Sequence, residues 1–170
     1  MRFVWCAITL MLVGIFVNPL GNALPRRWFH ADRFPYKCYA WEREGRVYQK
    51  IGIQKWKDIV PDMSRILPDM VKKELPGSGA VTADQAAALV QETCRAELVH
   101  GASCLLGLAF LWLWPDWGGV IVLAVWVLLA NLPFILIQRY NRPRLMRLAA
   151  LLRKRAQRKG EQNARTDPDL

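Results

Sequence analysis

Two carboxylates, a guanidinium and an imidazole (Glu92, Glu97, Arg95 and His100) lie in one short stretch, Glu92-Thr-Cys-Arg-Ala-Glu-Leu-Val-His100, and the carboxylates and the imidazole could transfer protons. At about 100° per residue, a helix would present Glu92, Glu97 and His100 on one broad face, with Arg95 on its flank. Because a carboxylate one turn from an imidazole can fix the tautomer and raise the basicity of the ring, we predict that Glu97 orients His100. His100 would then accept the proton of a hydroxyl that attacks an acyl carbonyl, and Glu92 is a further catalytic candidate.

The same spacing also has a structural interpretation. Glu92 with Arg95, and Glu97 with His100, are i,i+3 neighbours, which commonly form ion pairs on a helix surface. Spacing alone favours this interpretation, because structural ion pairs and catalytic sites look alike in a sequence. Glu97-x-x-His100 is also half of a di-iron motif, but the sequence lacks the second copy. We therefore predict neither a metal nor another cofactor.

A second polar stretch, Gln138-Arg-Tyr-Asn-Arg-Pro-Arg144, follows the last long apolar run. Arginine side chains here would suit a donor phosphate or a developing negative charge, and the neighbouring amides would suit a sugar or acyl oxygen. The predicted substrate-binding residues are Arg95, Asn131, Gln138, Arg139, Tyr140, Asn141 and Arg142. Anchoring to anionic lipid is the alternative role of these cations, above all from Arg147 onward.

The composition indicates the kind of element that must position these side chains. The chain has 170 residues, of which 53% are hydrophobic, and yet its net charge is +10. These values fit together if the apolar residues lie in a membrane and the basic residues lie beside anionic lipid. A nucleic-acid-binding protein of this length would not need apolar runs such as Gly118–Ile137, so no nucleic acid is expected as a partner.

The apolar pattern predicts an all-α integral membrane protein with an antiparallel transmembrane hairpin. Thr82 and Gln85 form a capping box at the start of one long helix, Thr82–Trp114, which begins in water and ends in lipid. A tight turn at Pro115-Asp116 leads into the second span, Trp117–Ile137, which Pro133 should kink. The hairpin should bring the two polar stretches opposite each other at one membrane boundary.

The chain divides into four parts on this pattern. They are an N-terminal transmembrane anchor or signal-like segment (1–24), a cytoplasmic juxtamembrane region (25–81), the long helix with the transmembrane hairpin and a basic, amphipathic surface helix (82–159), and a disordered tail (160–170). Within the second part we expect short helical or irregular pieces, with Tyr48, Ile51 and Trp56 against an apolar surface and a short helix at Met63–Leu75.

Charge predicts the orientation in the membrane. Ten of the 24 Lys and Arg residues lie after residue 138, and Arg26, Arg27, Arg33 and Lys37 directly follow the first apolar run, which only Arg2 precedes. The positive-inside rule therefore favours a multi-pass protein of the cell membrane, with its N-terminus outside and its C-terminus cytoplasmic. A cleaved signal peptide would instead export both basic regions.

The two polar motifs resemble those of a known enzyme family. Glu92–His100 and Asn131–Leu145 are similar to motifs of the glycosyl-4,4'-diaponeurosporenoate acyltransferases, the small membrane enzymes of staphyloxanthin biosynthesis. The segments Lys55-Trp-Lys57 and Leu152-Arg-Lys-Arg155 are also similar in order and spacing. The resemblance covers most of residues 41–159. It implies transfer of a fatty acyl group from an activated donor to a sugar hydroxyl of a glycosylated, carotenoid-type lipid. The partners would be the acyl donor, the glycolipid acceptor and the anionic inner leaflet of the membrane.

A non-enzymatic alternative is a membrane scaffold whose basic face binds anionic lipid or a partner protein. It predicts that reversing the charges of the tail abolishes function and that His100 is dispensable.

Overall fold

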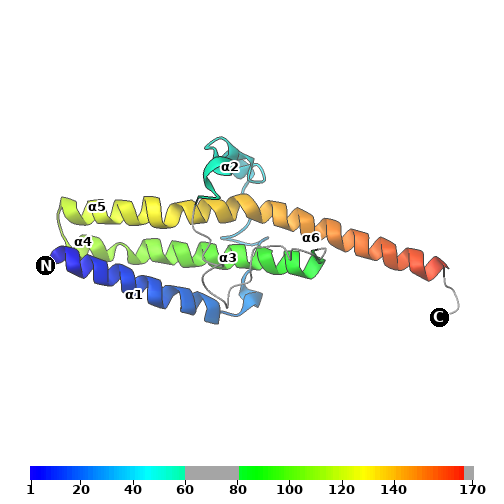
Figure 1. Ribbon diagram of the computed structural model, residues 1–170, viewed down its shortest axis with the longest axis horizontal. Helices are drawn as coiled ribbons and strands as arrows, with labels where there is room; N and C mark the ends of the chain where they lie inside the picture. The colour runs from blue at the N-terminus through cyan, green and yellow to red at the C-terminus, as the bar shows by residue number, and fades with distance from the viewer. Residues whose placement is uncertain (60–80, 167–170) are drawn as a thin grey trace.

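The computed structural model describes residues 1–59 and 81–166, and the regular structure in these ranges is helical throughout. Within them, three helical stretches are long and apolar enough to cross a membrane: Val4–Ala23, Ala83–Leu113 and Trp117–Gln162. Figure 1 shows these helices side by side in an elongated bundle. The predicted all-α membrane fold is therefore confirmed, whereas the helix expected at Met63–Leu75 lies outside the described residues.

Helix α1 (Arg2–Ala23) has about the length of a bilayer's hydrocarbon core, since its 22 residues span about 33 Å. At its start, Arg2 Nη1 donates a hydrogen bond of 3.1 Å to Asp116 Oδ2 in the turn of the hairpin. Near its end it packs closely against α3, where a Cβ added to Gly21 would collide with Cγ2 of Val99. The N-terminus and the hairpin turn thus lie at the same end of the bundle.

The long helix expected at Thr82–Trp114 is instead two helices, α3 (Ala83–Leu106) and α4 (Ala109–Leu113). Its start agrees with the prediction, because Thr82 and Gln85 form the capping box. The helix is interrupted after Leu106, where the backbone of Gly107 packs against the indole ring of Trp126. A Cβ at Gly107 would lie 2.6 Å from Cδ1 of that ring, so the close approach requires glycine, a weak helix former.

The second half of the hairpin contains a π-helical turn, and Pro133 is the only feature of the sequence that points to it. Asp116 caps α5 (Trp117–Val125) by accepting a 2.7 Å hydrogen bond from the backbone N–H of Gly118, which confirms the predicted turn. A π-helical turn, Trp126–Asn131, then precedes α6 (Leu132–Thr166). Pro133 was expected to kink the helix. It has no N–H to continue the α-helical ladder, and the widened turn lies directly before it.

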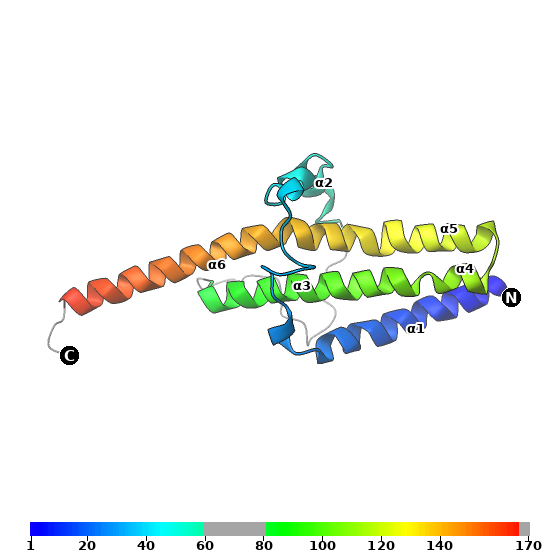
Figure 2. The same cartoon turned by 180° about the vertical axis from the view of Figure 1, so that it is seen from behind.

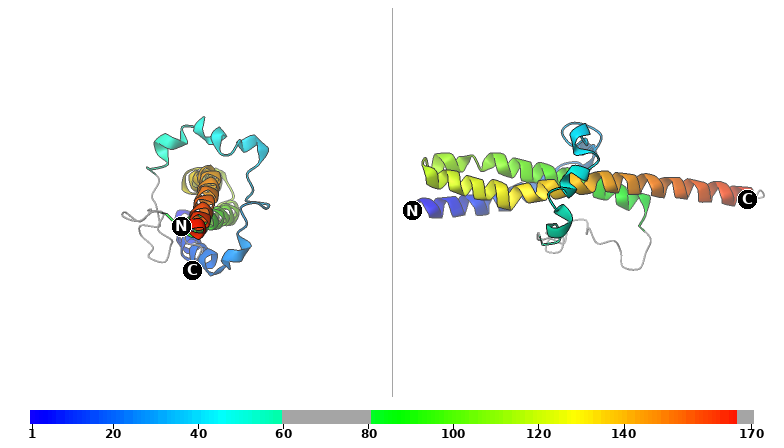
Figure 3. Two further views of the ribbon diagram at one scale, coloured as in Figure 1. Left: turned by 90° about the vertical axis from the view of Figure 1, so that its right-hand side faces the viewer. Right: turned by 90° about the horizontal axis from the view of Figure 1, so that it is seen from above.

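Residues 25–59 form a collar around the bundle, as the left view of Figure 3 shows. The collar consists of short 3₁₀ turns (Arg26–Trp28, Ala40–Glu42 and Arg46–Gln49) and one short helix, α2 (Ile53–Trp56). One cluster of its side chains packs on Cys94 of α3, and another packs on Tyr140 of α6. The expected short helical pieces are present, but Ile53 is the buried isoleucine and Ile51 is exposed.

Helix lengths place the collar relative to the hairpin turn. From Trp117 to Arg139, where the collar contacts α6, the helical rise is about 33 Å, which is close to the hydrocarbon thickness of a bilayer. The collar and the hairpin turn therefore lie about one membrane thickness apart. This spacing brings the collar to the same boundary as the polar motifs.

Helix α6 continues well past the collar, and Figure 2 shows its last part leaving the bundle along the bundle axis. The separate surface helix and the disordered tail from residue 160 were expected, but one helix runs through Pro143 as far as Thr166. Leu145, Leu148 and Leu152 keep the helical period after Pro143. Beyond residue 160, Glu, Gln, Ala and Arg are good helix formers, which explains why the helix does not end there.

Candidate active site

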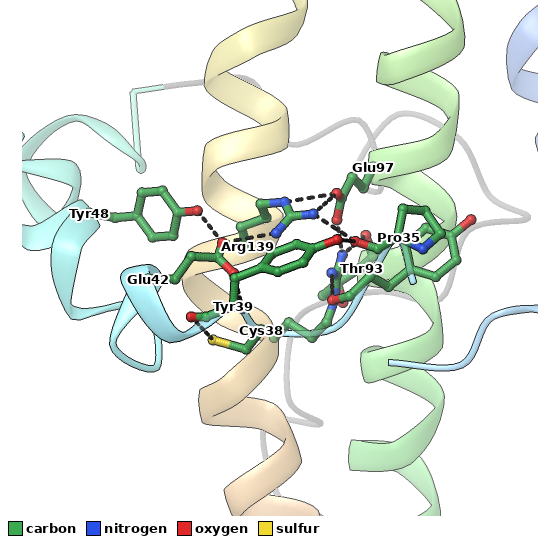
Figure 4. A network of polar contacts seen from close by, with 10 residues as sticks. Pro35, Cys38, Tyr39, Glu42, Tyr48, Thr93, Glu97 and Arg139 are labelled. Atoms are coloured by element: carbon green, nitrogen blue, oxygen red, sulfur yellow. Dashed lines mark hydrogen bonds and ion pairs between the residues drawn. The ribbon is translucent and has the colours of Figure 1, made fainter. Parts of the chain in front are cut away.

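The polar motifs of α3 and α6 face each other inside the collar, as the hairpin geometry predicts. Arg139 Nε donates a 2.8 Å hydrogen bond to Glu97 Oε1, and Arg142 Nη2 donates to Glu97 Oε2. Figure 4 shows Glu97 and Arg139 between the two helices, with Glu42 reaching them from the collar. We call Glu42, Glu97, Arg139 and Arg142 the arginine clamp.

Each nitrogen of the two clamp arginines has a protein partner. Arg139 donates from Nη1 to Glu42 Oε1 and from Nη2 to the carbonyl oxygen of Pro35, both at 2.9 Å. Arg142 is 2% exposed and donates from Nε to Thr93 Oγ1 (2.9 Å) and from Nη1 to the Tyr36 carbonyl oxygen (2.6 Å). Their predicted role, to bind the donor's phosphate or a developing negative charge, stays a prediction. In the structure their hydrogen bonds tie the collar to α3 and α6.

Glu42 is the anionic anchor of the clamp on the collar side, and sequence reasoning missed it. Its carboxylate accepts hydrogen bonds from the Tyr48 hydroxyl, the backbone N–H of Tyr39 (2.6 Å) and Arg139. Burial alone would raise the pKa of Glu42, but these donors and the guanidinium charge outweigh burial and hold the pKa below its usual value. Burial and the hydrogen bond to Glu42 also raise the pKa of Tyr48. The only sequence signal for Glu42 is its spacing of three residues from Tyr39, as in a capping box.

Glu92 and Arg95 form the i,i+3 ion pair of the structural interpretation. Arg95 donates to Glu92 and also to Asn22 Oδ1 near the end of α1. Both side chains of the pair are largely buried. In this arrangement the two charges serve each other and the contact between α1 and α3, while the catalytic role of Glu92 and the donor-binding role of Arg95 stay predictions.

His100 lies one turn further into the bundle and is held by two residues of the second span. Its Nδ1 lies 3.0 Å from Asn131 Oδ1, and its ring stacks on Phe134 with the ring centroids 4.5 Å apart and an interplanar angle of 11°. Asn131, which is 2% exposed, donates from Nδ2 to the Trp126 carbonyl oxygen at 2.9 Å, within the π-helical turn. We call His100, Asn131 and Phe134 the histidine seam.

The hydrogen bonds of Asn131 determine the tautomer of His100. Because the amide nitrogen of Asn131 donates to Trp126, its oxygen is the atom that faces His100, and this oxygen can only accept. This contact favours the neutral tautomer of His100 that carries its proton on Nδ1 and its lone pair on Nε2. Both oxygens of Glu97 contact clamp arginines, and it is the amide oxygen of Asn131 that lies beside His100 Nδ1. The expected role of Glu97 in orienting His100 stays a prediction.

The remaining predicted substrate-binding residues have different surroundings. Gln138 is buried on the face of α6 between Phe134 and Arg142, and its Oε1 has no hydrogen-bond partner among the described residues. Tyr140 belongs to the collar cluster, where its hydroxyl accepts a 3.0 Å hydrogen bond from Gln54 Nε2. Asn141 is half-buried. Of the predicted binding set, Asn131 and Gln138 are therefore the residues that lie along the seam.

Comparison with known proteins assigns this arrangement to a family. A family model described as glycosyl-4,4'-diaponeurosporenoate acyltransferase matches residues 25–151, which include the collar, the clamp and the seam. The chain belongs to this family. It is a membrane acyltransferase, as the resemblance of its polar motifs implied.

Relatives with the same description come from Staphylococcus aureus strains bovine RF122 / ET3-1, MRSA252 and USA300. Each is 27% identical to this chain over 158 residues, which is 91% of this chain and 92% of the relative. No solved structure matches the chain.

Proposed function

We propose that the enzyme moves a fatty acyl group from a thioester donor to a sugar hydroxyl of a glycosylated carotenoid-type lipid, with His100 as the general base. The relatives are described as acyltransferases of glycosyl-4,4'-diaponeurosporenoate, which supports an acceptor of this class. The observation that carries the proposal is the hydrogen-bonded series from the Trp126 carbonyl through Asn131 to His100, which leaves Nε2 as the basic nitrogen.

The reaction requires one proton to move twice. As the sugar oxygen attacks the thioester carbonyl carbon, Nε2 of His100 takes the hydroxyl proton and the new C–O bond forms. The C–S bond then breaks, and the imidazolium returns its proton to the departing thiolate. Asn131 Oδ1 accepts from Nδ1–H throughout, which stabilises the charged ring, and stacking on Phe134 limits its rotation.

The depth of the site suits an amphipathic acceptor. His100 lies three residues beyond Glu97 on α3, so it is about 4.5 Å deeper in the bundle than the arginine clamp. At this level a sugar could lie at headgroup depth while its lipid chain and the acyl chain stay in hydrocarbon. The unpartnered oxygen of Gln138 in the same row is a suitable acceptor for a second sugar hydroxyl.

The proposed orientation has the N-terminus and the hairpin turn outside the cell and the collar and the end of α6 in the cytoplasm. The ion pair of Arg2 with Asp116 supports a common side for the first two. The positive-inside rule supports a cytoplasmic side for the collar and α6, which carry most of the basic residues.

Acyl transfer by the purified protein tests the proposal directly. The protein would be reconstituted in nanodiscs with a fatty acyl thioester and a glycosylated carotenoid acid, and mass spectrometry would detect the acylated product. We expect His100→Ala to lower kcat by about 10²- to 10⁴-fold, as removal of a general base does. The matched control is His30→Ala, because His30 is exposed on the collar and should be dispensable.

Two results would contradict the proposal. Full transfer by an inserted and folded His100→Ala variant would exclude His100 as the base. An absence of acyl addition by the wild-type protein, combined with loss of function on charge reversal in the tail, would favour the membrane scaffold.

A further inference from the structure

The last part of α6 projects beyond the membrane-spanning bundle. From Trp117 to Thr166 the chain is helical without a break in direction, a length of about 75 Å. A bilayer with its headgroups is about 40–45 Å thick, so roughly 30 Å of this helix extends past it. We call residues 150–166 the arm. The right view of Figure 3 shows the arm continuing along the bundle axis.

The arm is basic and exposed. Residues 150–162 carry five basic side chains and one acidic side chain, Glu161, and every side chain in this range except Leu152 is exposed. The basic residues are Arg153, Lys154, Arg155, Arg158 and Lys159. Leu148, Leu151 and Leu152 recur at i, i+3 and i+4 beside them, the pattern by which one helix contacts another. The arm therefore offers an apolar strip bordered by positive charge.

The arginines near the histidine seam are engaged with the protein. Arg139 and Arg142 have partners at every nitrogen, and Arg95 binds Glu92 and Asn22. The exposed cations of the arm begin at Arg153, about 28 Å along α6 from Phe134. The exposed cations of α6 that an anionic donor would meet beyond the collar are therefore those of the arm.

We infer that the arm is the docking site for a small acidic acyl carrier protein, which presents the fatty acyl thioester on a flexible prosthetic group. This inference rests on the proposed function and identifies its donor. An acidic partner matches the charge of the arm, which would speed encounter and set orientation, and the apolar strip would contact a helix of the partner. The body of the carrier protein would stay at the arm while its prosthetic group reaches the seam. An anionic membrane surface is the competing ligand, but the arm runs along the bundle axis and away from the membrane plane.

A comparison of two donors tests the inference with the full-length protein in nanodiscs. The donors are an acyl carrier protein thioester and an acyl-pantetheine with the same acyl chain, which lacks a protein body. For the variant Arg153→Glu/Lys154→Glu/Arg158→Glu, we expect KM for the carrier thioester to rise by about tenfold or more. Both kinetic constants for acyl-pantetheine should stay unchanged, because the small donor does not need the arm.

A collar variant with the same change of charge is the matched control. Arg46→Glu/Lys50→Glu/Lys55→Glu alters three exposed cations of the collar, which the proposed orientation places on the same side of the membrane as the arm. It should leave KM for the carrier thioester within about twofold, since these cations lie outside the arm. Equal effects of the two triple variants on KM would indicate general electrostatic attraction and would overturn a specific docking site on the arm. An unchanged KM in the arm variant would also overturn it.

Two further readouts separate docking from chemistry and from lipid binding. Labelled carrier protein should bind discs that contain His100→Ala as tightly as wild-type discs. Trypsin cleavage of the arm should slow when carrier protein is added to discs of phosphatidylcholine alone. If phosphatidylglycerol protects the arm without carrier protein, the arm binds the membrane and the inference is wrong. If the wild type transfers an acyl group from neither donor, the proposed function itself has failed.

Discussion

The arginine clamp and the histidine seam lie one helical turn apart between the same two helices, yet they use polar groups in opposite ways. In the clamp, both oxygens of Glu97 and all nitrogens of Arg142 are paired within the protein. In the seam, Asn131 fixes the tautomer of His100 so that Nε2 is the basic atom. Charged residues therefore hold the two helices and the collar together, whereas the proposed chemistry uses a neutral amide and an imidazole.

Loss of the arginine clamp should have the largest effect on stability and would test the contrast between the two regions most directly. Arg142→Met removes one partner of a buried ion pair and leaves Glu97 with less compensation, which typically costs about 3–5 kcal/mol. We expect the collar to detach and Cys94, which is 0% exposed beneath it, to become reactive toward maleimide. Peptide mass spectrometry after labelling would measure this rate. Any folded protein that remains should keep its kcat, because the proposed reaction gives Arg142 no step.

Arg147→Met is the control for that experiment. Arg147 lies on the same helix and pairs with Glu44, but both side chains are more than half exposed. Exposed pairs contribute about 0–1 kcal/mol, so Cys94 should stay protected. If the two variants label at the same rate, the clamp does not retain the collar.

The next largest effect concerns Asn131 in the seam. Asn131→Leu removes the acceptor for His100 Nδ1–H, and loss of such an orienting partner typically costs about 10- to 100-fold in activity. We expect the loss in kcat, with Cys94 labelling unchanged because the clamp is intact. The assay is acyl-pantetheine turnover in nanodiscs. An Asn131→Leu variant with normal kcat would show that the tautomer of His100 does not matter and would remove the contrast between the two regions.

The spans were predictable from sequence because they depend on local pattern. The apolar runs, the Thr82–Gln85 capping box and the turn at Asp116 were all predicted, and the facing motifs followed from the length of the hairpin. The choice of partners was not predictable in this way. The helix spacing and the hairpin place Glu97 near both His100 and the arginines of α6, so the sequence does not say which of them Glu97 pairs with. That choice depends on the collar, which positions Arg139 through Glu42 and the Pro35 carbonyl oxygen. Asn131, which contacts His100, lies in a π-helical turn, and no sequence motif predicts this turn.

A smaller effect is the pH dependence of the stabilisation that Glu42 gives to the clamp. Hydrogen bonds and the Arg139 charge lower the pKa of Glu42 in the folded protein below its ordinary value of 4.5. The stabilisation by Glu42 is thus fully present above about pH 4.5 and is lost as pH falls through the lower, folded pKa. Glu42→Gln should cost about 1–3 kcal/mol near pH 7 and progressively less in that acidic range. Cys94 labelling by a thiol reagent active in acid, followed against pH for both proteins, measures the difference; parallel profiles would contradict it.

The smallest effect concerns Tyr140, a predicted substrate-binding residue of α6 that packs against the collar. Tyr140→Phe keeps the ring beside Tyr48 and Ile53 and removes only the hydroxyl that accepts from Gln54. The loss of one such hydrogen bond costs about 0.5–1.5 kcal/mol, so thermal unfolding should shift slightly while KM for both substrates stays constant. Gln54→Ala should reproduce the shift and add nothing to it in the double variant, because both changes remove the same bond. A KM that rises for Tyr140→Phe and not for Gln54→Ala would mean that the Tyr140 hydroxyl contacts substrate. Tyr140 would then belong to the substrate-binding site as well as to the packing between α6 and the collar.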